Sequence, residues 1–226
     1  MLLGAFRISN PARHSFMPVT RPYNVLVLDI DETLVWTQLW PEHDCDFYID
    51  SRTNGDNAYG VLKRPGVDAF LRWCFSSHDL FRTAIWTAGS ALYAQEICAA
   101  LLLPTETPEF VWASNRCSRV LRNPLDYELG LYTDEIDRYL LLKDFKKLRR
   151  VGYDLNRLLH LDNTPEVARR NYGNLVVMPT YQGEPEDRFL EILPPHLVNW
   201  FSAPEGVRRI DKRGWWRKTA PPVPTM

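Results

Sequence analysis

The stretch Asn24-Val-Leu-Val-Leu-Asp29-Ile-Asp31-Glu-Thr33 decides the fold, because an apolar run stops abruptly at two aspartates spaced by one residue. Val25 to Leu28 show the continuous apolar pattern of a strand buried on both faces, as in a parallel sheet. In open α/β sheets, ligands bind beyond the carboxyl ends of the strands, where Asp29 and Asp31 stand. Two carboxylates this close repel each other and require a raised pKa or a cation. A hard divalent metal with oxygen ligands is the simplest solution.

Strand-like and helical patterns alternate along the rest of the chain. We predict strands at 24–30, 81–87, 109–113, 157–161 and 174–178. Helices are predicted from the apolar spacing of 67–74, from Ser90 to Leu102, from Asp144 to Gly152, and briefly after Thr164. The alternation predicts an α/β fold with a central parallel sheet and helices on both faces.

The chain divides into a core and three less regular segments. Residues 35–62 carry aromatic residues among polar turn residues, which predicts a small β-rich insert after the first strand. Residues 1–20 lack the apolar core of a secretion signal and are expected to form a loose arm, with a transit peptide as the alternative. The main α/β domain would span 21–200, and 201–226 would be a basic, aromatic and partly disordered tail.

Composition narrows the class of protein. The 226 residues carry a formal net charge of −1 and are 45% hydrophobic, so one domain with a large core is expected and direct nucleic-acid binding is not. No apolar run is long enough to span a membrane. The chain has four cysteines and no Cys-x-x-Cys pair: Cys45, Cys74, Cys98 and Cys117. This favours reduced thiols in a soluble intracellular protein, located in the cytoplasm or, in a eukaryote, in the nucleus. No pattern specifies an oligomeric state.

Three further fragments carry polar groups suited to the edge of the sheet where the aspartates stand. Thr87-Ala88 ends the second predicted strand, Lys143 starts a predicted helix just upstream of the fourth strand, and Asp162-Asn163 ends that fourth strand. Carboxylates, a hydroxyl, a lysine and an amide suit phosphoryl transfer, whose transition state spreads charge over oxygens that need positive and hydrogen-bonding neighbours.

These fragments together resemble the four signatures of the haloacid dehalogenase (HAD) superfamily. Within it, Val61-Leu-Lys-Arg-Pro-Gly66, Lys143-Asp144 and Leu161-Asp-Asn-Thr-Pro165 are similar to the small C-terminal-domain phosphatase family, also called NLI-interacting-factor-like or FCP1-homology. The resemblance covers about residues 21–197. It implies a three-layer, Rossmann-like HAD fold and a Mg²⁺-dependent phosphatase of proteins.

The resemblance also implies a role for each catalytic residue. Asp29 would attack phosphorus and form an aspartyl phosphate. Asp31 would protonate the leaving oxygen and later deprotonate the attacking water. Thr87 would hydrogen-bond the phosphoryl oxygens, and Lys143 would neutralise Asp29 and the phosphate.

For the metal, the resemblance implies four ligand positions. Mg²⁺ would contact the Asp29 carboxylate, the Asp31 backbone carbonyl and the Asn163 side chain, and Asp162 would hold metal-bound water. Many relatives carry two acids where this chain has Asp162-Asn163, so the amide is expected to shift metal affinity while activity survives.

The residues and segments that could contact the substrate each have more than one interpretation. Ala88, together with Thr87 and Lys143, is a candidate for binding the phosphate. Arg64, Arg116 and Arg119 are candidates for a second phosphate or an acidic peptide, against surface or fold-stabilising roles. The aromatic insert is either simple packing or a trough for a proline-rich phosphopeptide. The tail either packs on the domain or contacts a membrane, RNA or partner.

The spacing of the signatures bears on the substrate. Little sequence remains between them for a lid domain, so an open site and a phosphoserine or phosphothreonine of a protein are expected. The alternatives are a phosphatase of a small metabolite, a non-catalytic binding protein of the same fold, and a glycosyltransferase that holds a metal and nucleotide sugar with Asp29 and Asp31.

Overall fold

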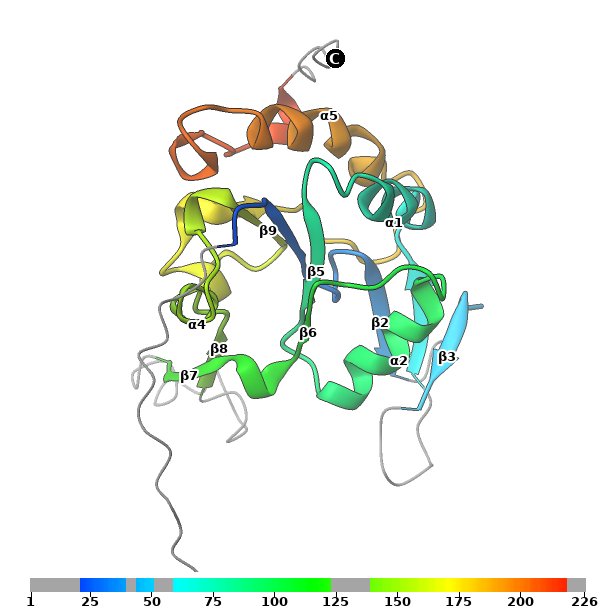
Figure 1. Ribbon diagram of the computed structural model, residues 1–226. Coiled ribbons are helices and arrows are strands. Elements are labelled where there is room, and N and C mark those ends of the chain that lie inside the picture. Colours follow the sequence, from blue (N-terminus) through cyan, green and yellow to red (C-terminus); the bar gives the residue numbers. More distant parts are fainter. Residues whose placement is uncertain (1–20, 40–43, 51–58, 123–138, 219–226) are drawn as a thin grey trace, which may run out of the picture.

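The computed structural model describes residues 21–39, 44–50, 59–122 and 139–218 (Figure 1). Its centre is a parallel five-stranded sheet with the strand order β10-β9-β1-β5-β6. The strands are β1 (Val25–Leu28), β5 (Arg82–Trp86), β6 (Val111–Trp112), β9 (Leu158–Asp162) and β10 (Leu175–Val177). All five predicted strands are confirmed, with ends that differ by up to two residues.

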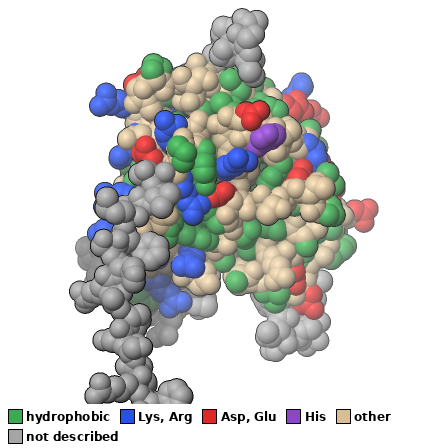
Figure 2. Space-filling model, in the orientation of Figure 1, with side chains coloured by type: hydrophobic (Ala, Val, Ile, Leu, Met, Phe, Trp, Pro, Cys, Tyr) green, Lys and Arg blue, Asp and Glu red, His purple; other side chains and the backbone are tan. Residues whose placement is uncertain are grey.

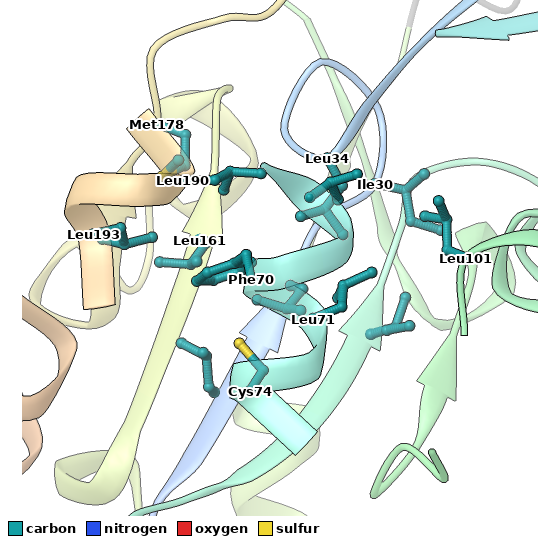
Figure 3. Close-up of a cluster of buried hydrophobic side chains, with 14 of the residues drawn as sticks. Ile30, Leu34, Phe70, Leu71, Cys74, Leu101, Leu161, Met178, Leu190 and Leu193 are labelled. Atoms are coloured by element: carbon teal, nitrogen blue, oxygen red, sulfur yellow. The ribbon is translucent and has the colours of Figure 1, made fainter. Parts of the chain in front are cut away.

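Helices cover both faces of this sheet, as predicted. Figure 1 shows them as α1 (Val67–Ser76), α2 (Ala91–Leu101), α4 (Lys146–Arg150) and α5 (Phe189–Phe201). On one face, Leu26 and Leu28 of β1 share a core with α1, α2 and α5, and Figure 3 shows part of it, including Phe70, Leu161 and Leu193. On the other face, Val25 and Val27 share a second core with Leu148 of α4. The alternation in β1 therefore supplies both cores, which is why the whole run is apolar.

Local sequence signals begin and end the helices. The Ser90 side chain caps α2 by accepting a hydrogen bond from the backbone N–H of Tyr93 at 3.1 Å, as predicted. The Asp144 carboxylate accepts one from the N–H of Lys146 at 3.0 Å, although α4 itself is only five residues long. Gly152 follows with a φ of 95°, a left-handed conformation that ends the helix.

The β-rich insert forms a separate antiparallel sheet with the order β2-β4-β3. It consists of β2 (Val35–Leu39), β3 (Phe47–Ile49) and β4 (Tyr59–Lys63), so it extends one residue beyond the predicted end. It begins immediately after the aspartate pair because Glu32 has a φ of 56° and its N–H donates to the carbonyl of Val35 at 2.7 Å. This tight turn places the insert directly beside the carboxyl end of β1.

A second antiparallel hairpin, β7 (Ser118–Leu121) with β8 (Tyr139–Leu142), was not predicted. It corrects the expectation that Lys143 starts a helix, because Lys143 follows β8 directly and α4 begins at Lys146. These strands form through pairing between segments that are distant in sequence. Such pairing leaves no periodic pattern of apolar residues by which the sequence alone could predict it.

The described part of the tail packs on the domain. Of the two alternatives given for the tail, the structure therefore supports packing on the domain. Val207 and Trp215 are buried in the first core, and the Trp215 indole N–H donates to the carbonyl of Val177 at 2.9 Å. The predicted arm (1–20) and the end of the tail (219–226) lie outside the described residues. Cys74, Cys98 and Cys117 are free thiols. In the described part of the chain, no helix combines the length and apolar character that crossing a membrane requires.

Candidate active site

The predicted site residues meet at the carboxyl end of the parallel sheet. Asp29 and Asp31 follow β1, and the N–H of Asp29 donates to the carbonyl of Leu161 in β9 at 3.0 Å. Thr87 follows β5, and Asp162 is the last residue of β9. Strands that are distant in sequence thus deliver their terminal side chains to one place, as parallel strands do.

Lys143 links two of the carboxylates. Its ammonium Nζ lies 2.7 Å from Asp162 Oδ2 and also donates to Asp29 Oδ1. The Lys143 side chain is 1% exposed. Burial alone would lower its pKa, but the carboxylates of Asp162 and Asp29 outweigh that effect and raise the pKa of Lys143 above its usual value. Lys143 is therefore charged and oriented by two acids.

Asp29 is buried at the centre of the site. Burial raises its pKa to about 7, Asp162 adds to the rise, and Lys143 opposes it. The hydroxyl of Thr33 donates to Asp29 Oδ2 at 3.4 Å and so links the two ends of this turn. Because its pKa is about 7, Asp29 is only partly ionised at neutral pH. A further positive charge nearby would favour the ionised form, which is the nucleophile.

Asp31 is held by two hydroxyl groups. Thr87 Oγ1 donates to Asp31 Oδ2 at 3.1 Å, and the phenol of Tyr93 donates to Asp31 Oδ1. The hydroxyl of Thr37, in the insert, lies 2.8 Å from the Tyr93 oxygen. Burial and the charge of Asp29 raise the pKa of Asp31. Sequence reasoning missed Tyr93, although its place three residues after the Ser90 cap puts it in the first turn of α2.

Asp162 and Asn163 complete the edge from β9. Asp162 Oδ1 accepts a hydrogen bond from the N–H of Thr164 at 2.8 Å, and Asn163 donates to Glu32 Oε2 at 2.9 Å. His160, also on β9, is fully buried with Nε2 at 3.2 Å from Asp162 Oδ2. Burial and the nearby Lys143 lower the pKa of His160 well below its usual value, so the ring is neutral and adds no charge.

The charge of this cluster fits a divalent cation. Asp29, Asp31 and Asp162 bring three carboxylates, whereas Lys143 brings one positive charge. Across the residues that the structure describes, no group of three or more His, Cys, Asp or Glu side chains forms a metal-binding cluster by itself. The groups that could hold magnesium are mixed oxygen donors, namely the Asp29 carboxylate, the Asn163 amide and the Asp31 backbone carbonyl.

The expectation that Arg64 binds substrate is not supported by its position. Its guanidinium is fully buried in a bidentate pair with Asp187, at 2.9 and 2.7 Å. It also donates to the carbonyls of Thr33 at 3.0 Å and of Pro179 at 2.9 Å. Arg64 therefore ties the turn after β1 to the segment before α5, which is the fold-stabilising alternative.

Two of the remaining candidates for substrate binding, Ala88 and Arg116, lie near the surface. Ala88 lines a cavity of about 530 Å³ together with residues around the hairpin. Arg116 is exposed, and its guanidinium carbon lies 5.4 Å from the centre of the Trp112 ring. Both can face a substrate that enters from solvent.

The fold and this set of loops define a HAD-like α/β protein with the acid pair after its first strand. Residues 24–208 match the family model described as NLI interacting factor-like phosphatase, so the chain belongs to that family. The FCP1-homology branch of the superfamily, expected from the motifs, is confirmed.

Individual relatives agree with this family. Human carboxy-terminal domain RNA polymerase II polypeptide A small phosphatase 1 is 31% identical over 172 residues, which cover 75% of this chain and 56% of the relative. The Caenorhabditis elegans CTD small phosphatase-like protein 1 is 30% identical over 197 residues, covering 85% of this chain and 35% of the relative. The chain thus spans between about a third and just over half of these relatives.

A solved structure agrees in fold. Fission yeast RNA polymerase II CTD phosphatase Fcp1 bound to beryllium fluoride superposes with a TM-score of 0.50 at 17% identity, over 78% of this chain and 50% of that one. This likeness concerns the fold alone.

Proposed function

We propose that this protein is a Mg²⁺-dependent phosphatase that hydrolyses phosphoserine or phosphothreonine in a protein through an aspartyl-phosphate intermediate. One observation carries the proposal: the Lys143 ammonium joins Asp29 and Asp162 while Thr87 joins Asp31, all at the carboxyl end of the parallel sheet. Family membership supports the same reaction class.

In the first step, an oxygen of Asp29 attacks phosphorus and the bond from phosphorus to the serine or threonine oxygen breaks. Asp31 transfers its proton to that oxygen, a task that its raised pKa favours because a carboxyl group must hold a proton to act as an acid. Lys143 and Thr87 lie where a phosphoryl group on Asp29 would develop negative charge.

In the second step, water attacks the phosphorus of the aspartyl phosphate and the bond to the Asp29 oxygen breaks. Asp31, now ionised, accepts the proton of the water, which restores both acids. Asp29, Asn163 and the Asp31 carbonyl would hold Mg²⁺, with Asp162 holding its water. When bound, the ion supplies positive charge that favours ionised Asp29 and orients the phosphate.

A protein substrate is supported by the small size of the elements beside the site. Between Asp31 and Thr87 the described residues form the three-stranded insert, α1 and β5, and none of these is a lid domain. The human relative is named for the carboxy-terminal domain of RNA polymerase II, a protein substrate class. Free thiols suit a reducing compartment, so we place the protein in the cytoplasm or a nucleus.

The test measures hydrolysis of p-nitrophenyl phosphate and of phosphoserine peptides with Mg²⁺, for the wild type and for Asp29→Asn, with and without EDTA. We expect turnover only in the wild type with Mg²⁺. Equal turnover in all samples would reject the proposal. Absence of turnover in the wild type with every phosphoester would favour a binding protein of this fold, whereas turnover of small phosphoesters but not of peptides would favour a metabolite phosphatase.

A further inference from the structure

The cavity beside Ala88 lies next to Thr87 of the proposed catalytic site but is used by none of the proposed steps. It is lined by side chains of the short 3-10 helix Ser114–Arg116, of β7 and of β8: Ser114, Asn115, Cys117, Arg119 and Leu141, with Ala88. Ala88 follows Thr87, and the Cys117 Sγ lies 4.0 Å from the carbonyl oxygen of Thr87. A peptide phosphate at Asp29 would therefore place neighbouring residues of the same peptide at the mouth of this cavity.

The cavity has a positive wall and no acidic one among the described residues. Arg119 is exposed on β7, and within the described residues it forms no ion pair with a carboxylate. The ammonium of Lys147 donates to the carbonyls of Arg116 and Cys117 at 2.7 and 3.0 Å, which places a second positive charge beneath the same loop. A solvent-exposed guanidinium with unused donors is suited to a carboxylate or a phosphate.

The two flanks of the catalytic site differ in charge. On the hairpin side, α4 carries Lys146, Lys147, Arg149 and Arg150 in five residues. On the insert side, exposed acids flank β3: Asp44, Asp46 and Asp50. Figure 2 shows Lys and Arg side chains gathered on the half of this face where Figure 1 places β7, β8 and α4, with Asp and Glu more frequent on the opposite half. An acidic peptide is therefore favoured in one orientation.

We infer that the cavity beside Ala88 is a subsite for a second anionic group of the substrate peptide, bound by Arg119. This inference rests on the proposed function and names its substrate class: a phosphopeptide with a second phosphate or an acidic side chain within a few residues of the reacting phosphate, on one side only.

The experiment uses peptides with one reacting phosphoserine and, at each flanking position, phosphoserine, glutamate or alanine. For the wild type we expect about a tenfold lower KM for an anionic residue than for alanine on one side of the phosphoserine, and no difference on the other side. A gain with phosphoserine alone identifies a phosphate subsite, whereas equal gains with glutamate identify a general anion subsite.

Arg119→Gln should bring the KM ratio of anionic to alanine peptides close to one. Asn115→Glu, which adds a carboxylate to the exposed lip of the cavity, should invert the preference and covers the case that the first variant does not fold. Arg209→Gln, an exposed arginine that lines a separate cavity, is the matched control and should keep the wild-type ratio.

The inference is overturned if the wild type treats all flanking residues alike, or if its preference survives both Arg119→Gln and Asn115→Glu. Fluorescence anisotropy of the same peptides on Asp29→Asn protein separates this result from failure of the proposed function. If the wild type hydrolyses nothing but the protein binds anionic peptides in an Arg119-dependent way, the subsite stands and the phosphatase activity does not.

Discussion

The phenol of Tyr93 donates a hydrogen bond to Asp31, so the first turn of α2 holds the carboxyl group that we propose as general acid. Thr37 lies 2.8 Å from the same phenol oxygen and connects this contact to the insert. The acid is thus oriented from two directions, by Tyr93 and by Thr87.

Replacing Tyr93 by phenylalanine should lower kcat/KM roughly 10- to 100-fold. As Asp31 gives up its proton it becomes charged, and a hydrogen bond to a charged group contributes about 1.5–3 kcal/mol. The measurement is steady-state hydrolysis of p-nitrophenyl phosphate with Mg²⁺. Tyr172→Phe removes the hydroxyl of an exposed tyrosine and is the control. Unchanged kcat/KM in Tyr93→Phe would show that Asp31 does not depend on this contact.

The stability of the metal-free protein should fall as the pH rises. The pKa of Asp29 is raised to about 7 from a usual value of 3.8, so between these values the folded state retains a proton that the unfolded state has released. Stability decreases wherever the folded state binds more protons, so the loss extends from about pH 4 to about pH 7 and is on the order of a few kcal/mol. Lys143 titrates above this window because its pKa is raised.

Urea denaturation in EDTA at several pH values measures this slope. Asp29→Asn cannot ionise and should reduce the slope, leaving the share contributed by Asp31 and Asp162, whose pKa values are also raised by burial. The mutant should also be more stable than the wild type at pH 8. A wild-type profile that is flat or rises over this window would contradict the charge balance described for the site.

Magnesium should stabilise the protein through Asn163. At a free concentration of 100 times the Kd, a ligand that binds only the folded state adds about 2.7 kcal/mol. Thermal unfolding with increasing Mg²⁺ measures the effect, and Asn163→Ala should raise the midpoint concentration about tenfold or more. Asn156→Ala, at an exposed asparagine away from the site, is the control. An identical Mg²⁺ response in Asn163→Ala would remove this residue from the ligand set.

Arg64→Met should destabilise the fold by about 3–5 kcal/mol, because it leaves the carboxylate of Asp187 buried without its partner. Urea denaturation measures the loss. The double variant Arg64→Met/Asp187→Leu should recover much of it, since neither charge then remains. If Arg64→Met keeps its stability but weakens binding of phosphopeptides, the substrate role would be restored.

Trp215→Ala should lower the free energy of unfolding by about 3–5 kcal/mol. The indole is fully buried against α5, and its N–H donates a hydrogen bond to the carbonyl of Val177. Trp216→Ala, at the neighbouring half-buried position, should cost clearly less. Thermal unfolding compares the two. Equal, small losses would show that residues 201–218 are dispensable for the domain.

The sequence specified the features that depend on local pattern. The apolar run before Asp29 predicted a doubly buried strand, and Ser90 predicted a helix start; the structure has both. Strand ends of a parallel sheet meet by topology, so Thr87 and Asp162 could be placed beside Asp29 and Asp31 before any coordinates.

Features that depend on contacts distant in sequence were not predictable in this way. The sequence left Arg64 open between substrate binding and a surface or fold-stabilising role. Only its pairing with Asp187, 123 residues away, shows that its guanidinium stabilises the fold. Tyr93 follows an ordinary helical pattern, and only the packing of α2 against the loop after β1 directs its hydroxyl to Asp31. The β7–β8 hairpin joins strands on either side of residues 123–138, and its pairing leaves no periodic signature.

The antiparallel insert is a sheet of its own, attached to the nucleophile loop through the turn at Glu32 and through the Thr37–Tyr93 contact. Its outward residues, such as the 58% exposed Tyr48, can therefore be exchanged while the parallel strands that hold the reacting groups stay in register. This separation gives protein engineers a graft site: an insert from another source, retaining Thr37, is a route to a new target with the chemistry left in place.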